Sequence, residues 1–173
     1  MELAWFIRDC TTETFRRRLV ESLVQPLLDY CTVVCLDAPD EQRIHLQRLS
    51  NSCMRYIFGV RRDEHISPYR KRLGWLRSDS RRLYFQAIIL YKVIRMREPE
   101  YLASVFTKHK PRPSSRGIPP ELTIPAVSTE TGARAFQVQG ARFWNSLPPA
   151  LRFLPSLSSF KRAARQYLLD LDH

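Results

Sequence analysis

The chain has 173 residues, of which 44% are hydrophobic and 11% are aromatic. This is enough for one core, or one core with a smaller appendage, and it excludes a string of large domains. No apolar run approaches the roughly 20 residues that cross a bilayer, and the Met1 region lacks a basic leader and a small-residue cleavage site. We therefore expect an intracellular protein, nuclear or cytoplasmic, with no membrane partner.

The charge is strongly positive, with 28 Lys and Arg against 17 Asp and Glu and a formal net charge of +11. Only five of the cations are lysines, so arginine dominates. Guanidinium groups bind phosphates bidentately and stack on bases, which ammonium groups do not. The balance favours contact with nucleic acid. The alternative is a merely soluble basic domain, or a genome whose codon usage favours arginine.

The first elements in chain order are helical. Thr12 or Thr14 can cap a helix that places Phe15, Leu19 and Leu23 on one face. Pro26 sits where a helix bends or restarts. The apolar run that follows, residues 27–34, is expected to be buried on most sides.

Three further helices follow. Apolar residues at spacings of three and four predict a helix over residues 40–58, ended by Gly59. A short helix is expected from Ser67 to Leu73, ended by Gly74. A long helix, central because its apolar stripe is wide, is expected from Ser78 or Asp79 to about Met96.

The last third has a different composition. Residues 107–120 are rich in Pro, Ser and cations and predict a flexible basic linker. Residues 122–127 and 134–139 have β-prone character and are expected to form a short β-hairpin. A Pro-bounded loop and a final amphipathic helix, capped by Ser156 or Ser158, complete the chain.

The predicted fold class is mainly α, with a bundle of four or five helices and a small helical C-terminal segment. The expected divisions are a helical domain over residues 1–106, the linker over 107–120 and a C-terminal extension over 121–173.

No catalytic constellation stands out. The carboxylates lie near predicted helix ends, where they cap helices or face solvent, and are not clustered as a two-metal site requires. Cys31 and Cys35 have no second cysteine pair, so we expect no metal, and the five glycines form no phosphate-binding loop. We predict no cofactor, no small-molecule substrate and no enzymatic activity.

Cations and aromatic residues alternate between residues 61 and 97, which is typical of a surface that meets phosphates. Helix starts near Ser67 and Ser78 also offer free amides to a phosphate. Trp75 and Tyr84 are alternatively core residues, with the arginines as a solvated face. The predicted phosphate contacts are Arg61, Arg62, Arg70, Lys71, Arg72, Arg77, Arg81 and Arg82, with Lys108, Lys110, Arg112 and Arg116 on the linker adding unspecific attraction.

Four stretches, in order, resemble the C-terminal part of the reverse transcriptase of LINE-type non-LTR retrotransposons. They are LVESLVQPLLDYCTVV, LQRLSNSCMRYIFGV, ISPYRKRLGWLRSDSRRLYFQAIILYKV and ARFWNSLPPALRFLPSLSSFKRAARQYL. Together they cover about residues 19 to 170. The chain departs from the family at Ser50, where Gln is frequent, and at Cys35-Leu36, where Trp is common. The residues that carry the last stretch as a structural motif are Trp144, Asn145, Leu147, Pro148 and Phe160, joined by Trp75 from the third.

The resemblance implies a helical thumb and the extension beyond it, without the polymerase palm. The family's palm carries a (Y/F)xDD motif, and this sequence has no Asp-Asp pair. A thumb holds a template-primer duplex through its backbone, which basic helices without catalytic acids can do. The implied partners are RNA or an RNA–DNA hybrid, and a palm or finger domain supplied by another chain.

Two other readings stay open. The chain is alternatively a truncated transposon remnant or a protein-interaction module without activity of its own, marked by an exposed apolar face around Leu23, Leu27, Leu28 and Val34. The third reading, an independent enzyme, would require that the purified chain incorporate nucleotides on a primed template.

Overall fold

The computed structural model describes residues 11–30, 32, 38–107 and 121–172. These residues are mainly helical, which confirms the predicted fold class. They group into two compact units: unit 1 holds the residues up to Arg82 together with Asp172, and unit 2 runs from Leu83 to Leu171. The division falls inside one helix, whereas the sequence places its boundary after residue 106. The three expected divisions, including the linker, stay predictions.

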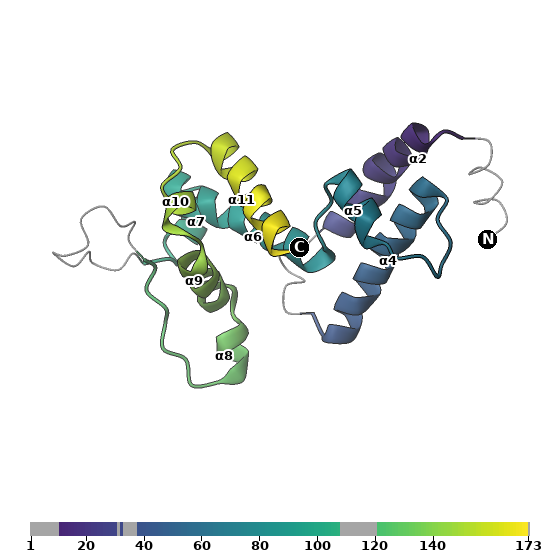
Figure 1. Ribbon diagram of the computed structural model, residues 1–173. Helices are drawn as coiled ribbons and strands as arrows, with labels where there is room; N and C mark the ends of the chain where they lie inside the picture. The colour runs from purple at the N-terminus through teal and green to yellow at the C-terminus, as the bar shows by residue number, and fades with distance from the viewer. Residues whose placement is uncertain (1–10, 31, 33–37, 108–120, 173) are drawn as a thin grey trace. The chain divides into compact units, whose positions relative to one another are not determined.

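The first described helix of unit 1 is α2, Glu13–Leu19 (Figure 1). Thr12 caps its first turn, because the Thr12 hydroxyl oxygen accepts a hydrogen bond from Phe15 N at 3.3 Å. A π-helical turn, η1, Val20–Val24, follows and leads into α3, Gln25–Asp29. Pro26 lies in the first turn of α3, directly after the π-helical turn. Helical structure is continuous from Glu13 to Asp29, so the hydrogen-bonding pattern changes beside the proline and the helix does not start again there.

The next helices have the predicted bounds. α4, Asp40–Phe58, ends at Gly59, whose φ of 68° is left-handed, and α5, Ser67–Leu73, ends at Gly74 with φ 64°. α6, Ser78–Tyr91, begins in unit 1. α4 contacts both α2 and α5 (Figure 1).

The core of unit 1 joins residues from the helices and from the loops beside α5. Its buried members are Val20, Met54, Ile57, Ile66, Leu73 and Trp75. Trp75 is only 7% exposed, so its core interpretation is confirmed, and its ring is not available to stack on a base.

Unit 2 continues from α6 through η3, Lys92–Met96, a π-helical turn that ends at Arg97 in the left-handed region. Its other helices are α7, Glu100–Ala103; α8, Glu130–Arg134; α9, Phe136–Ser146; α10, Pro149–Arg152; and α11, Leu157–Leu171.

The predicted β-hairpin is wrong. Residues 134–139 lie in α8, α9 and the junction between them, residues 122–127 form no strand, and the described part of the chain holds no strand at all. Val138, Ala141 and Trp144 recur at helical spacing and are all buried, so packing of one helical face outweighs the local β propensity of this segment.

The WNSLP stretch is a packed structural motif in unit 2. The Trp144 ring lies 6.1 Å from that of Phe160, and both side chains are buried with Leu147. The Asn145 amide donates to Leu122 O and accepts from Leu122 N, both at 2.9 Å. Pro148 precedes α10 with ψ near 137° and forms the entry to that helix.

One charge in unit 2 is buried without compensation. Arg152, at the end of α10, is 3% exposed, and its Nε and Nη1 have no hydrogen-bond partner among the described residues. Burial of an unpaired guanidinium destabilises a fold.

Candidate nucleic-acid interface

The predicted phosphate contacts that remain accessible surround α5. Gly59 ends α4, and the chain then runs through a loop, α5 and a second left-handed glycine before it enters α6. We name the cations of this stretch the α5 basic cluster: Arg61, Arg62, Arg70, Lys71, Arg72 and Arg77. All are exposed except Arg70, which is half-buried.

Two members of the cluster have acidic partners. Arg61 lies 3.7 Å from Asp63, and both side chains are more than three-quarters exposed, so this pair is screened by solvent and weak. Arg72 lies 3.0 Å from Glu13 and also stacks over the Phe58 ring at 5.0 Å. Both guanidiniums are exposed enough to bind a phosphate.

Arg70 and Arg77 form a pair of like charges. Burial lowers the pKa of Arg70, the positive charge of Arg77 lowers it further, and Asp172 raises it. The Arg70 Nε is buried and has no hydrogen-bond partner within the described part of the chain. Because like charges repel, an anion placed between these two side chains would be stabilised.

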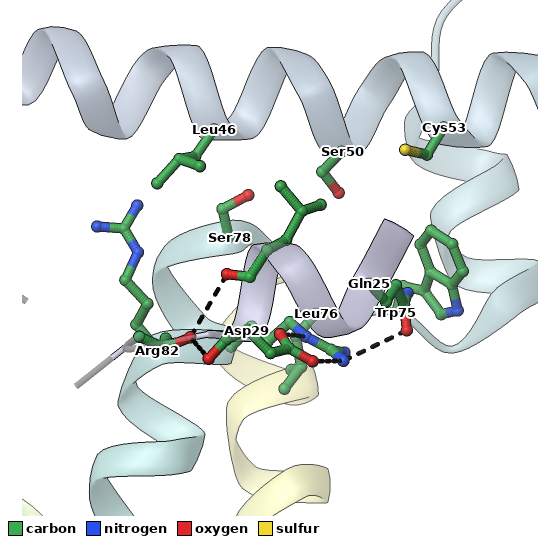
Figure 2. Close-up of a pocket in the computed structure, with 12 residues that line it drawn as sticks. Gln25, Asp29, Leu46, Ser50, Cys53, Trp75, Leu76, Ser78 and Arg82 are labelled. Atoms are coloured by element: carbon green, nitrogen blue, oxygen red, sulfur yellow. Dashed lines mark hydrogen bonds and ion pairs between the residues drawn. The ribbon is translucent and has the colours of Figure 1, made fainter. Parts of the chain in front are cut away.

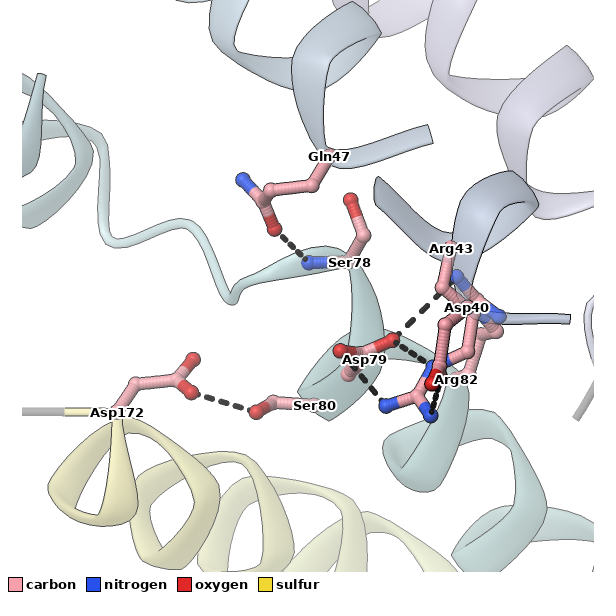
Figure 3. Close-up of polar contacts among 8 residues, drawn as sticks. All are labelled: Asp40, Arg43, Gln47, Ser78, Asp79, Ser80, Arg82 and Asp172. Carbon is pink, nitrogen blue, oxygen red and sulfur yellow. Dashed lines mark hydrogen bonds and ion pairs between the residues drawn. The ribbon is translucent and has the colours of Figure 1, made fainter. Parts of the chain in front are cut away.

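Arg81 and Arg82 are engaged within the protein. Arg81 forms two hydrogen bonds with the Asp29 carboxylate, at 2.5 and 2.6 Å. Arg82 is 4% exposed, and its Nη2 lies 3.4 Å from Asp79 Oδ1 (Figure 3). The Asp79 carboxylate also accepts hydrogen bonds from Nε and Nη2 of Arg43, at 3.2 and 3.1 Å. We therefore leave both arginines out of the candidate interface.

The start of α6 offers fewer free amides than expected. Ser78 N donates to Gln47 Oε1 at 2.8 Å (Figure 3). Arg77 N donates to Asp172 Oδ2, also at 2.8 Å. Protein side chains thus already occupy donors that the sequence assigned to a phosphate.

A positioning residue was missed by the sequence reasoning. Arg55, on α4, donates from Nε to Arg61 O and from Nη2 to Arg62 O, both at 3.3 Å, and from Nη2 to Glu64 O at 3.4 Å. It therefore holds the loop that carries Arg61 and Arg62. Arg55 lies in the helix that the sequence predicts over residues 40–58, and no local pattern signals that its side chain reaches six to nine residues ahead.

The four linker cations, Lys108, Lys110, Arg112 and Arg116, lie outside the described residues. Their predicted role stays a prediction.

A small cavity lies in unit 1 beside α4, and its lining includes Cys53, Trp75 and the Asp29–Arg81 pair (Figure 2). Its volume of about 40 Å³ holds a few waters at most. Ligand pockets are about ten times larger, so the cavity is a packing defect rather than a substrate site. Burial raises the pKa of the Cys53 thiol, which keeps it protonated and unreactive. No cluster that could hold a metal ion occurs among residues 11–30, 32, 38–107 and 121–172.

Comparisons with protein-family models, with curated proteins and with solved structures find no match to this chain. None of the helices in the described ranges combines the length and the apolar character that spanning a membrane requires.

Proposed function

We propose that this chain is a non-catalytic nucleic-acid-binding module that grips a template-primer through its phosphate backbone, as the thumb of a LINE-type reverse transcriptase would. The proposal assigns the contacts to the α5 basic cluster, and it draws on the sequence resemblance and the net charge of +11.

The observation that carries the proposal is the incomplete neutralisation of this cluster. Among the described carboxylates, Glu13 and Asp63 alone reach it within ion-pairing distance, and both pairs are exposed. The charged groups of Arg62, Lys71 and Arg77 form no ion pair in the described part of the chain. Unneutralised guanidiniums in one short stretch attract a polyanion without base specificity.

The test is a titration of labelled RNA–DNA hybrid, duplex and single strand at two salt concentrations. Each neutralised phosphate contributes about 0.7–0.9 to the slope of log affinity against log salt. The triple variant Arg62→Gln, Lys71→Gln, Arg77→Gln should lower that slope by about 2 to 3.

A matched control changes the same charge elsewhere. Arg142, Lys161 and Arg162 are exposed cations of unit 2, and replacing all three by Gln also removes three charges. We expect this control to retain most of the slope. The assignment would be overturned if the affinity did not depend on salt concentration, or if both triple variants lowered the salt slope equally.

A second function, a protein-interaction module, is favoured by one observation. Leu23, Leu27 and Tyr30 are 62%, 76% and 79% exposed, and their spacing of four and three places them on one helical face. Of the other residues expected on this face, Leu28 is half-buried against the cavity, and Val34 lies outside the described residues.

Gel filtration separates the two functions. A clean monomer at all concentrations favours a self-sufficient module, whereas dimerisation that Leu27→Ser abolishes favours a docking face. Phe153→Ser, which removes a 45% exposed apolar residue from unit 2, is the control.

A further inference from the structure

An acidic side chain already occupies the edge of the α5 basic cluster. Asp172 Oδ2 accepts a hydrogen bond from Arg77 N at 2.8 Å. Its Oδ1 accepts one from Ser80 Oγ at 2.6 Å (Figure 3). Asp172 groups with unit 1, although it directly follows α11 in the chain. The carboxylate uses donors that a phosphate oxygen would otherwise use.

The same carboxylate acts on the like-charged pair. Asp172 opposes the effect of Arg77 on Arg70, so the three charged groups are close enough to interact. Neither guanidinium lies within 4.0 Å of Asp172 or of another described carboxylate, so the compensation is partial. A backbone phosphate carries the same single negative charge as the carboxylate, and its oxygens can approach the two guanidiniums that Asp172 does not reach.

We propose that Asp172 is an internal competitor for nucleic-acid phosphates at Arg70 and Arg77, an autoinhibitory contact that opens when the backbone of a strand takes its place. This inference rests on the proposed function and names its regulation. When a phosphate replaces Asp172, Arg77 N and Ser80 Oγ donate to a phosphate oxygen instead of a carboxylate oxygen. The replacement therefore leaves neither donor without an acceptor.

The first test compares Asp172→Asn with Asp170→Asn in binding labelled single-stranded DNA of 20 thymidines. Both variants remove one negative charge, but Asp170 is exposed and its carboxylate accepts a hydrogen bond from the Gln166 amide, at 2.8 Å, on the same helix. In both proteins the bound strand contacts Arg70 and Arg77, but in Asp172→Asn it no longer has to displace a carboxylate. The expected gain is about sixfold at 0.1 M salt, the size of one phosphate contact, with a similar salt slope because the number of phosphates bound is the same. We expect this gain for Asp172→Asn and less than a twofold change for Asp170→Asn.

A second variant protects the test against misfolding. Ser80→Ala removes one of the two hydrogen bonds of Asp172 without changing any charge. Because a phosphate in the same place would lose the same donor, affinity should change by less than about twofold, and a gain as large as that of Asp172→Asn would contradict a competition based on charge. The amide resonance of Arg77 gives a direct readout: added DNA should move it, in the unaltered protein, toward its position in Asp172→Ala.

The outcomes separate the two proposals. If the unaltered chain binds with a steep salt dependence and Asp172→Asn matches Asp170→Asn, the competitor is refuted and the proposed function stands. If none of the proteins binds DNA, RNA or the hybrid, both fail. An Arg77 resonance that does not move when DNA binds also refutes displacement.

Discussion

Asp29 and Arg81 join α3 to α6 through two parallel hydrogen bonds, Nε to Oδ1 at 2.5 Å and Nη2 to Oδ2 at 2.6 Å. The side chains are 21% and 30% exposed, so the pair is largely removed from water. An arginine that the sequence offers to nucleic acid is therefore a structural element of unit 1.

Asp29→Asn should lower the free energy of unfolding by about 2 kcal/mol, because it removes the charge that compensates a half-buried guanidinium. Urea unfolding measures the loss. Asp63→Asn is the control, since the Asp63–Arg61 pair is exposed and should contribute about 0.5 kcal/mol or less. Equal losses in the two variants would show that the Asp29–Arg81 pair has no special role.

Asn145→Ala should destabilise unit 2 by about 2 kcal/mol, since Leu122 would lose hydrogen bonds at both its N–H and its carbonyl in a partly buried site. Thermal unfolding checks this expectation. Gln166→Ala, which removes an exposed hydrogen bond to Asp170, should leave the melting temperature nearly unchanged. An Asn145→Ala protein as stable as this control would contradict the structural role of the motif.

Gly59→Ala should cost about 1–2 kcal/mol because φ is 68° there. No atom lies within 4 Å of the added Cβ, so the cost arises in the backbone alone. Gly59→Asn should cost less, since asparagine adopts this conformation more readily. Chemical denaturation of the three proteins tests the order, and a loss for Asn as large as that for Ala would contradict the backbone argument.

The Cys53 thiol should react slowly with a disulfide reagent in the folded chain, because burial raises its pKa. A protein in which Cys10, Cys31 and Cys35 are serine isolates its signal. The pKa of this thiol is higher in the folded chain than in the unfolded chain. The free energy of unfolding is therefore unaffected by the thiol at a pH below its pKa in the unfolded chain, and it falls as the pH rises from that value toward the pKa in the folded chain. Equal reaction rates in native and urea-unfolded protein would contradict the prediction.

Helix positions could be predicted because their signals are local. Gly59 and Gly74 mark boundaries through their own backbone chemistry, and the structure places a helix end at each. Pro26 lies beside the change from a π-helical turn to an α-helix. The β-hairpin failed because residues 134–139 contain β-prone side chains, while the buried face of α9 is completed only by Ala141 and Trp144 further on.

Side-chain direction was the part that the sequence could not supply. In the sequence, nothing distinguishes Arg81 and Arg82 from the exposed cations before them. Their side chains are engaged within the protein because the fold places Asp29 beside Arg81 and Asp79 beside Arg82. The apolar run that begins at Leu27 suggested burial, yet Leu27 and Tyr30 are among the most exposed apolar residues. No spacing rule connects Asp172 with Arg77, since 95 positions separate them.

The buried, unpaired guanidinium of Arg152 is a site at which a substitution can stabilise the protein. A methionine there has similar length and no charge to desolvate, so Arg152→Met should raise the free energy of unfolding by about 1–3 kcal/mol. Calorimetry would detect the gain, and a lower melting temperature would reveal an acceptor for this arginine in solution. Such a background would tolerate mutational scanning of the basic cluster, where loss of binding must be told apart from loss of fold.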